Sequence, residues 1–360
     1  SPLKILYGVQ GTGNGHTTRA RVMAKAFNQR SDIQVDYLFS GRDKDKYFDM
    51  EVFGDFASYR GLSFETKGGK ISKSATFKSA KFSELYRDIK RVRASDYDLI
   101  INDFEPISAW AAKRNNIPSI SISHQAAFVH PIPQQPGTLL DKFITRYFAP
   151  TDLHLGVHWY HFGHAIMPPF IEADDSHCPP SRTYLVYLPF EEVDDINALL
   201  DPFSEHDFIC FHPKIEQDVQ AGNIQWRRPS KADFVNILQS CSGVIANAGF
   251  ELASECLHFG KKLLIKPLSG QYEQLSNAKT LVQLGLAQSM PTLDSDTVEE
   301  WLIKPAIERI AYPQNPDILI DWLVKRDWKA VNSLCEQLWS KVRFPQSVVT
   351  QLDKLPIANR

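Results

Sequence analysis

Residues 243–278 carry the densest set of groups that could do chemistry, GVIANAGFELASECLHFGKKLLIKPLSGQYEQLSNA. Gly243–Ala246 is short and apolar, which is typical of a buried parallel strand, and Phe250–Phe259 has helical spacing. The turn 247–249 lies between them and ends in a glycine. A strand that runs through a glycine into a helix directs free backbone N–H groups and the positive helix end at one point. That is the geometry of a phosphate site.

Glu255 follows Gly249 by two helical turns, which is roughly 9 Å along a helix axis at about 1.5 Å per residue. A carboxylate at that distance could accept hydrogen bonds from the two hydroxyls of a ribose. The alternative is an ordinary strand-to-helix turn with a solvated glutamate. The residues that follow predict a second buried strand at Leu263–Ile265, a loop, and another helix from about Gln271.

The N-terminal residues also place polar groups at a turn. Leu3–Val9 predicts a buried strand, Gln10–Arg19 reads QGTGNGHTTR, and a helix is expected from there to about Arg30. The glycines give G-x-G-x-G rather than the G-x-G-x-x-G of dinucleotide-binding proteins, and no Lys-Ser/Thr pair follows them as in a P-loop. Neither of these nucleotide-binding turns is therefore predicted here.

Two further strand ends carry ionisable side chains. Leu99–Asp103 predicts a strand that ends in a carboxylate, and Ser119–Ser123 predicts one that ends at His124. In an open α/β sheet, ligands bind at the carboxyl edge of the strands, so His16, Asp103 and His124 are expected to share one edge. Asp103 could instead cap the helix that begins at Pro106. Glu105 is the other candidate, both for the carboxylate at the sheet edge and for the helix cap.

Composition sets the broad class. The chain has 360 residues, 43% of them hydrophobic and 23% charged, which suits a globular protein of two domains. A net charge of −2 gives no indication of a nucleic-acid partner, and no apolar run approaches the ~20 residues of a membrane span. The five cysteines are scattered without paired spacing, which predicts a reducing cytoplasm and no structural zinc.

The histidines between residues 154 and 164 superficially suggest a metal site. His154 and His158 fall on a predicted strand, Leu153–Trp159, where four residues span about 13 Å at ~3.3 Å per residue. That distance is too long for a shared ion, and no metal is expected.

The stretch 246–278 resembles the nucleotide-binding signature of GT-B glycosyltransferases, both the UDP-glycosyltransferases (HAGFGTxxE…DQxxNA) and the peptidoglycan N-acetylglucosaminyltransferase (SGAxTxSE…QQxxNA). The matching residues are Ala248-Gly249-Phe250, Ser254-Glu255, Glu273-Gln274 and Asn277-Ala278. The resemblance implies that this stretch holds the nucleotide sugar, with Glu273 and Gln274 on the hydroxyls of the donor sugar. It also places Arg228 in the loop that contacts the base.

The N-terminal turn resembles the first turn of the same fold, GTGGHxxP in the peptidoglycan enzyme. Gly13, Asn14 and Gly15 then belong to the nucleotide-sugar site, and His16 is implied as the catalytic base, with Asp103 to orient it. An imidazole suits proton abstraction near neutral pH. His124 and Glu105 are left as possible contacts to acceptor or phosphate.

The chain departs from the family pattern in both motifs. Asn14 replaces a glycine and Arg19 stands in place of the proline. In the second motif, Asn247 stands where one group has histidine, Glu251 replaces a glycine, and Leu252 replaces a threonine. A carboxylate at 251 is expected to repel phosphate unless it points away.

The predicted fold is therefore α/β, of the GT-B type: two doubly wound Rossmann-like domains facing across a cleft. The expected boundaries are an N-terminal acceptor-side domain over residues 1–166, a proline-rich linker over 167–182, and a nucleotide-sugar domain over 183–316. Residues 317–360, with three tryptophans, are expected to form helices that pack back across the junction.

The function implied is an inverting, metal-independent glycosyl transfer from a UDP-linked sugar to an unknown acceptor hydroxyl on a lipid, a saccharide or a small molecule, without a cofactor. A UDP-sugar 2-epimerase-like hydrolase or isomerase shares the architecture, and a non-catalytic binding relative would account for Glu251 and Leu252. The protein is expected in the cytoplasm. The basic segment Lys67–Lys81 is expected to form a loop over the cleft, where it could also contact an anionic lipid surface.

Overall fold

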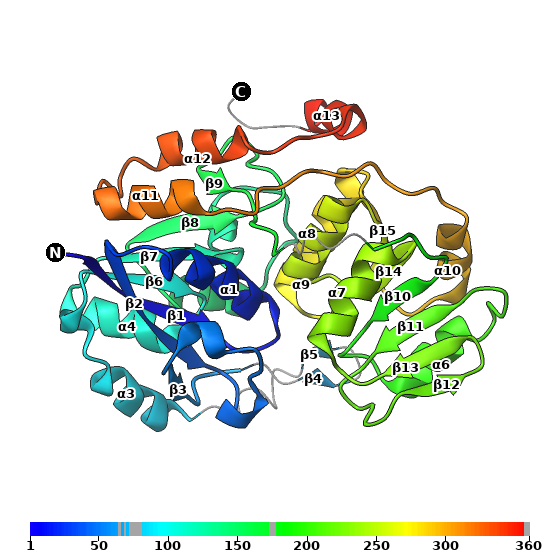
Figure 1. The fold of residues 1–360 in the computed structure, drawn as a ribbon, viewed down its shortest axis with the longest axis horizontal. Coiled ribbons are helices and arrows are strands. Elements are labelled where there is room, and N and C mark those ends of the chain that lie inside the picture. Colours follow the sequence, from blue (N-terminus) through cyan, green and yellow to red (C-terminus); the bar gives the residue numbers. More distant parts are fainter. Residues whose placement is uncertain (64–65, 68–69, 72–80, 173–177, 356–360) are drawn as a thin grey trace.

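A computed structural model describes residues 1–63, 66–67, 70–71, 81–172 and 178–355. It contains two separate seven-stranded sheets, each covered by helices on both faces (Figure 1). The prediction of two doubly wound domains is confirmed. Most of the segment Lys67–Lys81, with its predicted role as a loop over the cleft or a contact to lipid, lies outside the described residues.

The first sheet is parallel throughout, in the order β3-β2-β1-β6-β7-β8-β9. Its strands are β1 Leu3–Gln10, β2 Ile33–Ser40, β3 Ala57–Tyr59, β6 Leu99–Asp103, β7 Ser119–Ser123, β8 Leu153–Val157 and β9 Ile166–Met167. The helices beside it are α1 Gly15–Phe27, α3 Phe82–Arg91, α4 Pro106–Asn115 and α5 Leu139–Tyr147. The shorter elements are β4 Thr66–Lys67, β5 Lys70–Ile71 and the 3₁₀ turns η1 Lys44–Lys46, η2 Glu51–Phe53, η3 Ala94–Asp96 and η4 Gln125–Val129.

The second sheet has the order β12-β13-β11-β10-β14-β15-β16, with only the edge strand β12 antiparallel. Its strands are β10 Tyr184–Tyr187, β11 Phe208–Phe211, β12 Val219–Ala221, β13 Ile224–Arg227, β14 Gly243–Asn247, β15 Lys262–Lys266 and β16 Ala287–Ser289. The helices of this half are α6 Val193–Leu200, α7 Lys231–Ser240, α8 Phe250–Phe259, α9 Tyr272–Gln283 and α10 Ser295–Leu302.

Helices cover both faces of the central strands, so that even the serines of β7 (SISIS) are buried. Every residue of β6, β7, β14 and β15 is buried. The last strand of the first sheet ends at Met167 and the first strand of the second begins at Tyr184.

The C-terminal helices α11 Asp317–Lys325, α12 Val331–Trp339 and α13 Gln346–Asp353 follow the second sheet in sequence. The chain nevertheless returns to the first domain, where α11 and α12 lie beside β8 and β9 (Figure 1). The Trp339 indole donates to the carbonyl of Ile166 at 2.6 Å, and Arg30 pairs with Asp321 at 2.5 Å. These contacts tie the end of the chain to the N-terminal half.

The first helix begins earlier in the sequence than expected, and this difference affects the site. The glycine-rich turn was expected to extend to Arg19, but α1 begins at Gly15, so His16 and Arg19 lie on the helix itself. Gly15 permits a close approach there, because a Cβ at this position would lie 3.1 Å from the Cγ of Glu251 on α8. The first turns of α1 and α8 therefore meet across the two domains.

Candidate active site between the two domains

A cleft of about 380 Å³ lies between the carboxyl ends of the two sheets. It brings together most of the side chains that the sequence singles out, from both halves of the chain. The predicted residues that line it are Gly13, Asn14, Gly15, His16, His124, Asn247, Gly249, Phe250, Glu251, Glu255, Glu273 and Gln274. Asp103, Glu105, Arg228 and Ala248 are not part of its lining.

The predicted pair of His16 and Asp103 is in direct contact. The His16 Nδ1 and Asp103 Oδ1 atoms lie 2.6 Å apart, and the Asp103 carboxylate is fully buried while the His16 ring keeps 15% of its exposure. With Nδ1 bonded to Asp103, Nε2 is the ring nitrogen available to a group in the cleft. This is the geometry that a base with an orienting carboxylate requires.

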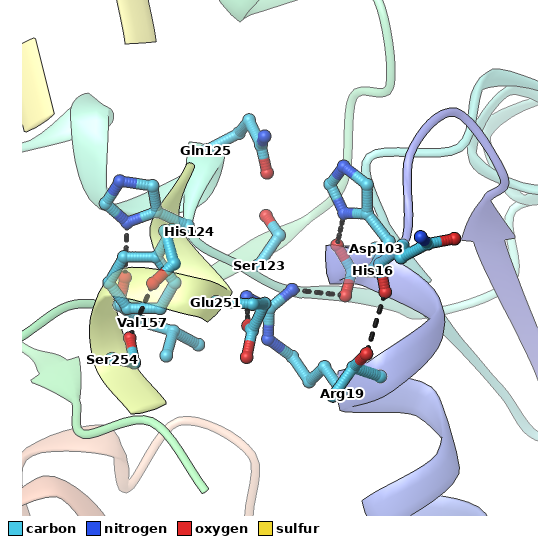
Figure 2. Close-up of polar contacts among 12 residues, drawn as sticks. His16, Arg19, Asp103, Ser123, His124, Gln125, Val157, Glu251 and Ser254 are labelled. Atoms are coloured by element: carbon cyan, nitrogen blue, oxygen red, sulfur yellow. Dashed lines mark hydrogen bonds and ion pairs between the residues drawn. The ribbon is translucent and has the colours of Figure 1, made fainter. Parts of the chain in front are cut away.

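The second carboxylate oxygen of Asp103 accepts a hydrogen bond from a residue that the sequence does not indicate as its partner. The Arg19 Nη1 atom donates to Asp103 Oδ2 at 2.5 Å, and its Nη2 atom donates to Glu251 of the other domain. Figure 2 shows the four side chains in a row between α1 and α8, with the Arg19 guanidinium in the middle. The carboxylate of Glu251 is thus paired with a cation.

The charges in this row keep Asp103 and Arg19 ionised. Burial opposes the charged form of Asp103, but Arg19 and His16 outweigh it and hold the pKa of this carboxyl below its usual value. Burial also opposes the charge of Arg19, yet Asp103 and Glu251 hold the pKa of the guanidinium above its usual value. Burial raises the pKa of Glu251, and Arg19 offsets only part of that effect.

The strained backbone at Phe104 separates the two acids of the strand end. Phe104 has φ of +52°, a left-handed conformation that is costly for a residue with a large side chain. On one side of this bend, Asp103 meets His16 and Arg19. On the other side, the Glu105 carboxylate accepts the N–H groups of Ile107 and Ser108 at 2.7 and 2.6 Å and the hydroxyl of Ser40 at 2.6 Å.

Glu105 is therefore the helix cap of α4, and its predicted contact to acceptor or phosphate is wrong. Its side chain is fully buried away from the cleft, with both oxygens bonded inside the domain. A side-chain acceptor at this position satisfies N–H groups that the first turn of the helix leaves free.

Helix α8 points its N-terminal end into the cleft, as the sequence predicts. Gly249 is the N-cap residue of α8, and as a glycine it has no side chain that could bond the first N–H groups of the helix. A Cβ at this position would meet no atom within 4 Å. The open first turn presents backbone N–H groups and the positive end of the helix dipole, which favour an anion.

Ala248 and Gln274 have a structural task in this turn. The Gln274 side-chain carbonyl accepts the N–H of Ala248 at 3.1 Å and of Leu268 at 2.9 Å. Asn277 donates to the carbonyl of Ala248 at 2.9 Å. The amide of Ala248 is therefore not available to phosphate, and the carbonyl of Gln274 is not available to a sugar, so both residues support the turn.

Asn247 and Glu273 both belong to the lining of the cleft. The Asn247 amide donates to the carbonyl of Lys266 at 2.9 Å, and its buried Oδ1 atom has no hydrogen-bond partner among the described residues. One oxygen of Glu273 accepts from Gln125 of the first domain at 2.7 Å. Both side chains line the cavity.

Glu255 is not the solvated glutamate of an ordinary turn. It is half-buried, and burial together with Glu251 and Glu172 raises its pKa to about 8. Glu172 in turn pairs with Lys231 at 2.7 Å and with Arg21 at 3.5 Å. Glu255 thus faces the cleft beside a network of charged groups from both domains.

His124 does not offer a nitrogen to a ligand. Its Nδ1 atom lies 2.8 Å from the carbonyl oxygen of Val157, and its Nε2 atom lies 2.6 Å from the Asn277 Oδ1 atom of the other domain. The ring stacks on Phe250 with centroids 4.0 Å apart. With both ring nitrogens engaged inside the protein, His124 joins the two domains.

Arg228 is also misplaced by the sequence reading. It is exposed, and its backbone N–H donates to Asp218 at 3.0 Å rather than into the cleft. The next two residues, Pro229 and Ser230, do line the cavity. The loop thus reaches the cleft one or two positions after Arg228.

Several polar residues of the cleft are not assigned to the site by the sequence reading, among them Arg19, Gln125, Glu172 and Lys231. Two of them carried a signal. Arg19 falls where the family has proline, and Gln125 follows a strand end directly. Glu172 and Lys231 lie outside any motif, and only the packing of the two domains brings them together.

A second cavity of about 400 Å³ adjoins the cleft on the side of the first domain. Phe104 and Gln125 line both cavities. The remaining walls combine aromatic groups such as Phe128 and Tyr272 with polar groups from β7 and α5. The two spaces thus meet close to His16, whose ring lies over Phe104 with centroids 6.3 Å apart.

Two doubly wound domains with a cleft between their carboxyl edges define the GT-B class of glycosyltransferases, and the predicted resemblance is confirmed. The chain belongs to glycosyl transferase family 1, whose model matches residues 3–305. No curated protein sequence matches it.

Several solved structures share this two-domain architecture. The glycotransferase of kitacinnamycin is 13% identical, with a TM-score of 0.61 over 99% of this chain and 100% of that one. MurG of Acinetobacter baumannii is 15% identical, with a TM-score of 0.53 over 98% of both chains. MnaA of S. aureus, solved with UDP, is 11% identical, with a TM-score of 0.55 over 84% of this chain and 88% of that one. At such identities the likeness shows the fold.

Proposed function

We propose that this glycosyltransferase is an inverting enzyme that moves a sugar from a UDP-linked donor to an acceptor hydroxyl without a metal ion. The observation that carries the proposal is the contact between His16 and Asp103, 2.6 Å long, in a cleft that the open N-terminus of α8 also lines. One side of the cleft thus holds a base, and the other holds a site for a leaving group that carries negative charge.

The step divides between the two domains. His16 Nε2 takes the proton of the acceptor hydroxyl while the oxygen forms a bond to the anomeric carbon of the sugar. The bond from that carbon to the diphosphate breaks on the opposite face, and its electron pair leaves with the UDP. Asp103 orients the ring and stabilises the imidazolium that forms, and the first turn of α8 stabilises the departing charge.

The donor half is supported by residues around α8. Glu255 lies two turns into the helix and faces the cleft, where its carboxyl can bond the ribose hydroxyls. We assign Glu273 and Asn247 to the donor sugar, since both residues line the cavity. UDP is the nucleotide that the resemblance favours, and MnaA, which shares the fold, was solved with UDP.

The acceptor half is proposed to use the cavity of about 400 Å³ beside His16. Its aromatic walls suit a flat or aliphatic group, and its hydroxyl and amide groups, Ser121, Ser123 and Gln134 among them, suit a polar one. The proposed acceptor is a hydroxyl of a lipid, a saccharide or a small molecule. No helix among the described residues is both long and apolar enough to span a membrane.

A second candidate function deserves a test because four glutamates line the cleft: Glu172, Glu251, Glu255 and Glu273. A UDP-sugar 2-epimerase-like hydrolase or isomerase needs several acids and bases around the sugar. Incubation of the protein with UDP-N-acetylglucosamine alone separates the two, because an epimerase or hydrolase converts it without an acceptor. Unchanged donor, combined with sugar transfer when acceptors are added, supports the transferase.

A panel of nucleotide sugars tested by thermal shift checks the donor directly. A ligand at a hundred times its dissociation constant adds about 2.7 kcal/mol of stability, which shifts the melting temperature measurably. We expect UDP and one UDP-sugar to stabilise the protein more than the other nucleotides do. A protein that no UDP compound stabilises at millimolar concentration would contradict the proposal.

A further inference from the structure

Arg19 and Glu251 depart from the family pattern at two distant points of the chain, and the structure pairs them with each other. Arg19 stands where the resembling motif has proline, and Glu251 stands where it has glycine. The two side chains come from different domains, on the first turns of α1 and α8, and both are at least nine-tenths buried. Each departure therefore supplies the partner that the other requires.

This pair is connected to the proposed base through one carboxylate. Asp103 Oδ1 bonds His16 and Asp103 Oδ2 bonds Arg19, so the row runs His16–Asp103–Arg19–Glu251 (Figure 2). A cation beside Asp103 weakens the attraction of that carboxylate for a positive imidazolium. An anion beside the cation restores it, because the charges of Arg19 and Glu251 cancel.

We propose that Arg19 and Glu251 are positioning residues that adjust the strength of the His16–Asp103 base, and that contact between the domains switches the base to full strength. This inference rests on the proposed function. When Glu251 lies against Arg19, the row carries one uncompensated negative charge beside His16. If the domains separate, Glu251 leaves with the C-terminal half, Arg19 neutralises Asp103, and His16 becomes a weaker base. Proton abstraction is thereby limited to the arrangement in which donor and acceptor sides meet.

The charged groups that face His16 come from three elements. Arg19 is on its own helix α1, Asp103 ends β6, and Glu251 begins α8. Glu255 and Glu172 act on Glu251 from further along the cleft, and Glu273 acts on His124 rather than on His16. The substitutions therefore have to distinguish the effects of these three nearest groups on His16.

The experiment measures the titration of His16 by NMR on protein labelled with ¹³C in the histidine rings, with the signal assigned by its loss in His16→Gln. We expect Glu251→Gln, which removes a negative charge and keeps the shape, to lower the titration midpoint of His16 by about one pH unit. Arg19→Met removes the positive charge, so we expect it to raise the midpoint by a similar amount. The double variant restores the charge of the row and should titrate close to the wild type.

Arg19→Met leaves two buried acids without their cation and is the variant most at risk of not folding. Glu251→Gln and the double variant carry less risk of not folding. A lowered His16 midpoint in Glu251→Gln, together with a midpoint close to that of the wild type in the double variant, is sufficient to decide. Arg19→Lys serves as a control, because it keeps the positive charge and should leave the midpoint near that of the wild type.

A merely structural pair would lower the thermal stability of the variants and leave the His16 midpoint unchanged, and that result overturns the proposal. A midpoint that moves in the same direction in Glu251→Gln and Arg19→Met overturns it as well. A UDP titration of the wild type by calorimetry separates this inference from the proposed function. If UDP does not bind while the midpoints move as expected, the donor assignment fails and the charge coupling stands.

Discussion

The side-chain carbonyl of Gln274 accepts the backbone N–H of Ala248 at 3.1 Å and that of Leu268 at 2.9 Å, and so ties the turn after β14 to the loop after β15. All three residues are buried. Gln274→Ala should therefore leave two buried N–H groups without an acceptor and lower the free energy of unfolding by about 2–4 kcal/mol. Urea unfolding monitored by tryptophan fluorescence measures this change.

Gln274→Glu is the matched control for that experiment. It keeps an acceptor oxygen at the same distance along the side chain, so we expect a smaller loss of stability than for alanine. If Gln274→Ala were as stable as the wild type and lost only affinity for the donor sugar, that result would support the direct sugar contact that the sequence predicts.

Glu105→Ala tests the assignment of the helix cap. The substitution removes the acceptor for two N–H groups at the start of α4 and for the Ser40 hydroxyl. We expect unfolding to become easier by about 2–4 kcal/mol, because three buried donors lose a carboxylate partner. UDP affinity measured on the folded variant should be unchanged, since Glu105 does not line the cleft. A loss of UDP binding without a loss of stability would contradict the cap.

The fold followed from the sequence because its signals are local. Short buried strands, a glycine at the end of α8 and a proline at the start of α4 each specify an element from neighbouring residues. The His16–Asp103 contact was also within reach, since both residues sit at the carboxyl edge of adjacent strands, β1 and β6, in one parallel sheet.

The rest of the site depends on how the two domains meet, which no single motif records. In the sequence, Arg19 stands out only because it replaces the proline of the family motif. Its partner Glu251 stands out only as a carboxylate that is expected to repel phosphate. Glu105 and Asp103 are two positions apart, and the bend at Phe104, with its positive φ, directs Asp103 to His16 and Glu105 to the start of α4. His124 and Gln274 make hydrogen bonds inside the protein that the sequence does not show, because polar residues at strand and helix ends serve both structure and binding.

The raised pKa of Glu255 predicts a dependence of stability on pH. Its pKa is about 8 in the folded protein and close to 4.3 in an unfolded chain. Between these values the folded state holds a proton that the unfolded state has released, so the contribution of Glu255 to stability falls as the pH rises from about 4 to about 8. Glu255→Gln cannot ionise and should gain on the wild type over that interval.

We expect the advantage of Glu255→Gln to be near its minimum at pH 5 and to reach on the order of 2–4 kcal/mol at pH 8.5. Urea unfolding of both proteins at the two pH values measures it. Glu273→Gln, which makes the same substitution at another glutamate of the cleft lining, controls for the loss of a carboxylate as such. Parallel stability curves for the wild type and Glu255→Gln would contradict a buried, protonated Glu255.

The last prediction separates binding from turnover with two alanine variants. If the Glu255 carboxyl bonds both ribose hydroxyls, Glu255→Ala should weaken UDP binding by about 2–3 kcal/mol, as expected for hydrogen bonds to a charged group. Affinity in the wild type should also rise from pH 7 to pH 9, since the ionised carboxylate accepts both bonds. His16→Ala should bind UDP nearly as well as the wild type, because its ring faces the acceptor side, and should lose a factor of about 100 to 10,000 in turnover. Calorimetric titrations of UDP into both variants, with transfer assays for His16→Ala, give the two readings. Equal UDP affinity in the wild type and Glu255→Ala would remove α8 as the donor helix, and full turnover in His16→Ala would remove His16 as the base.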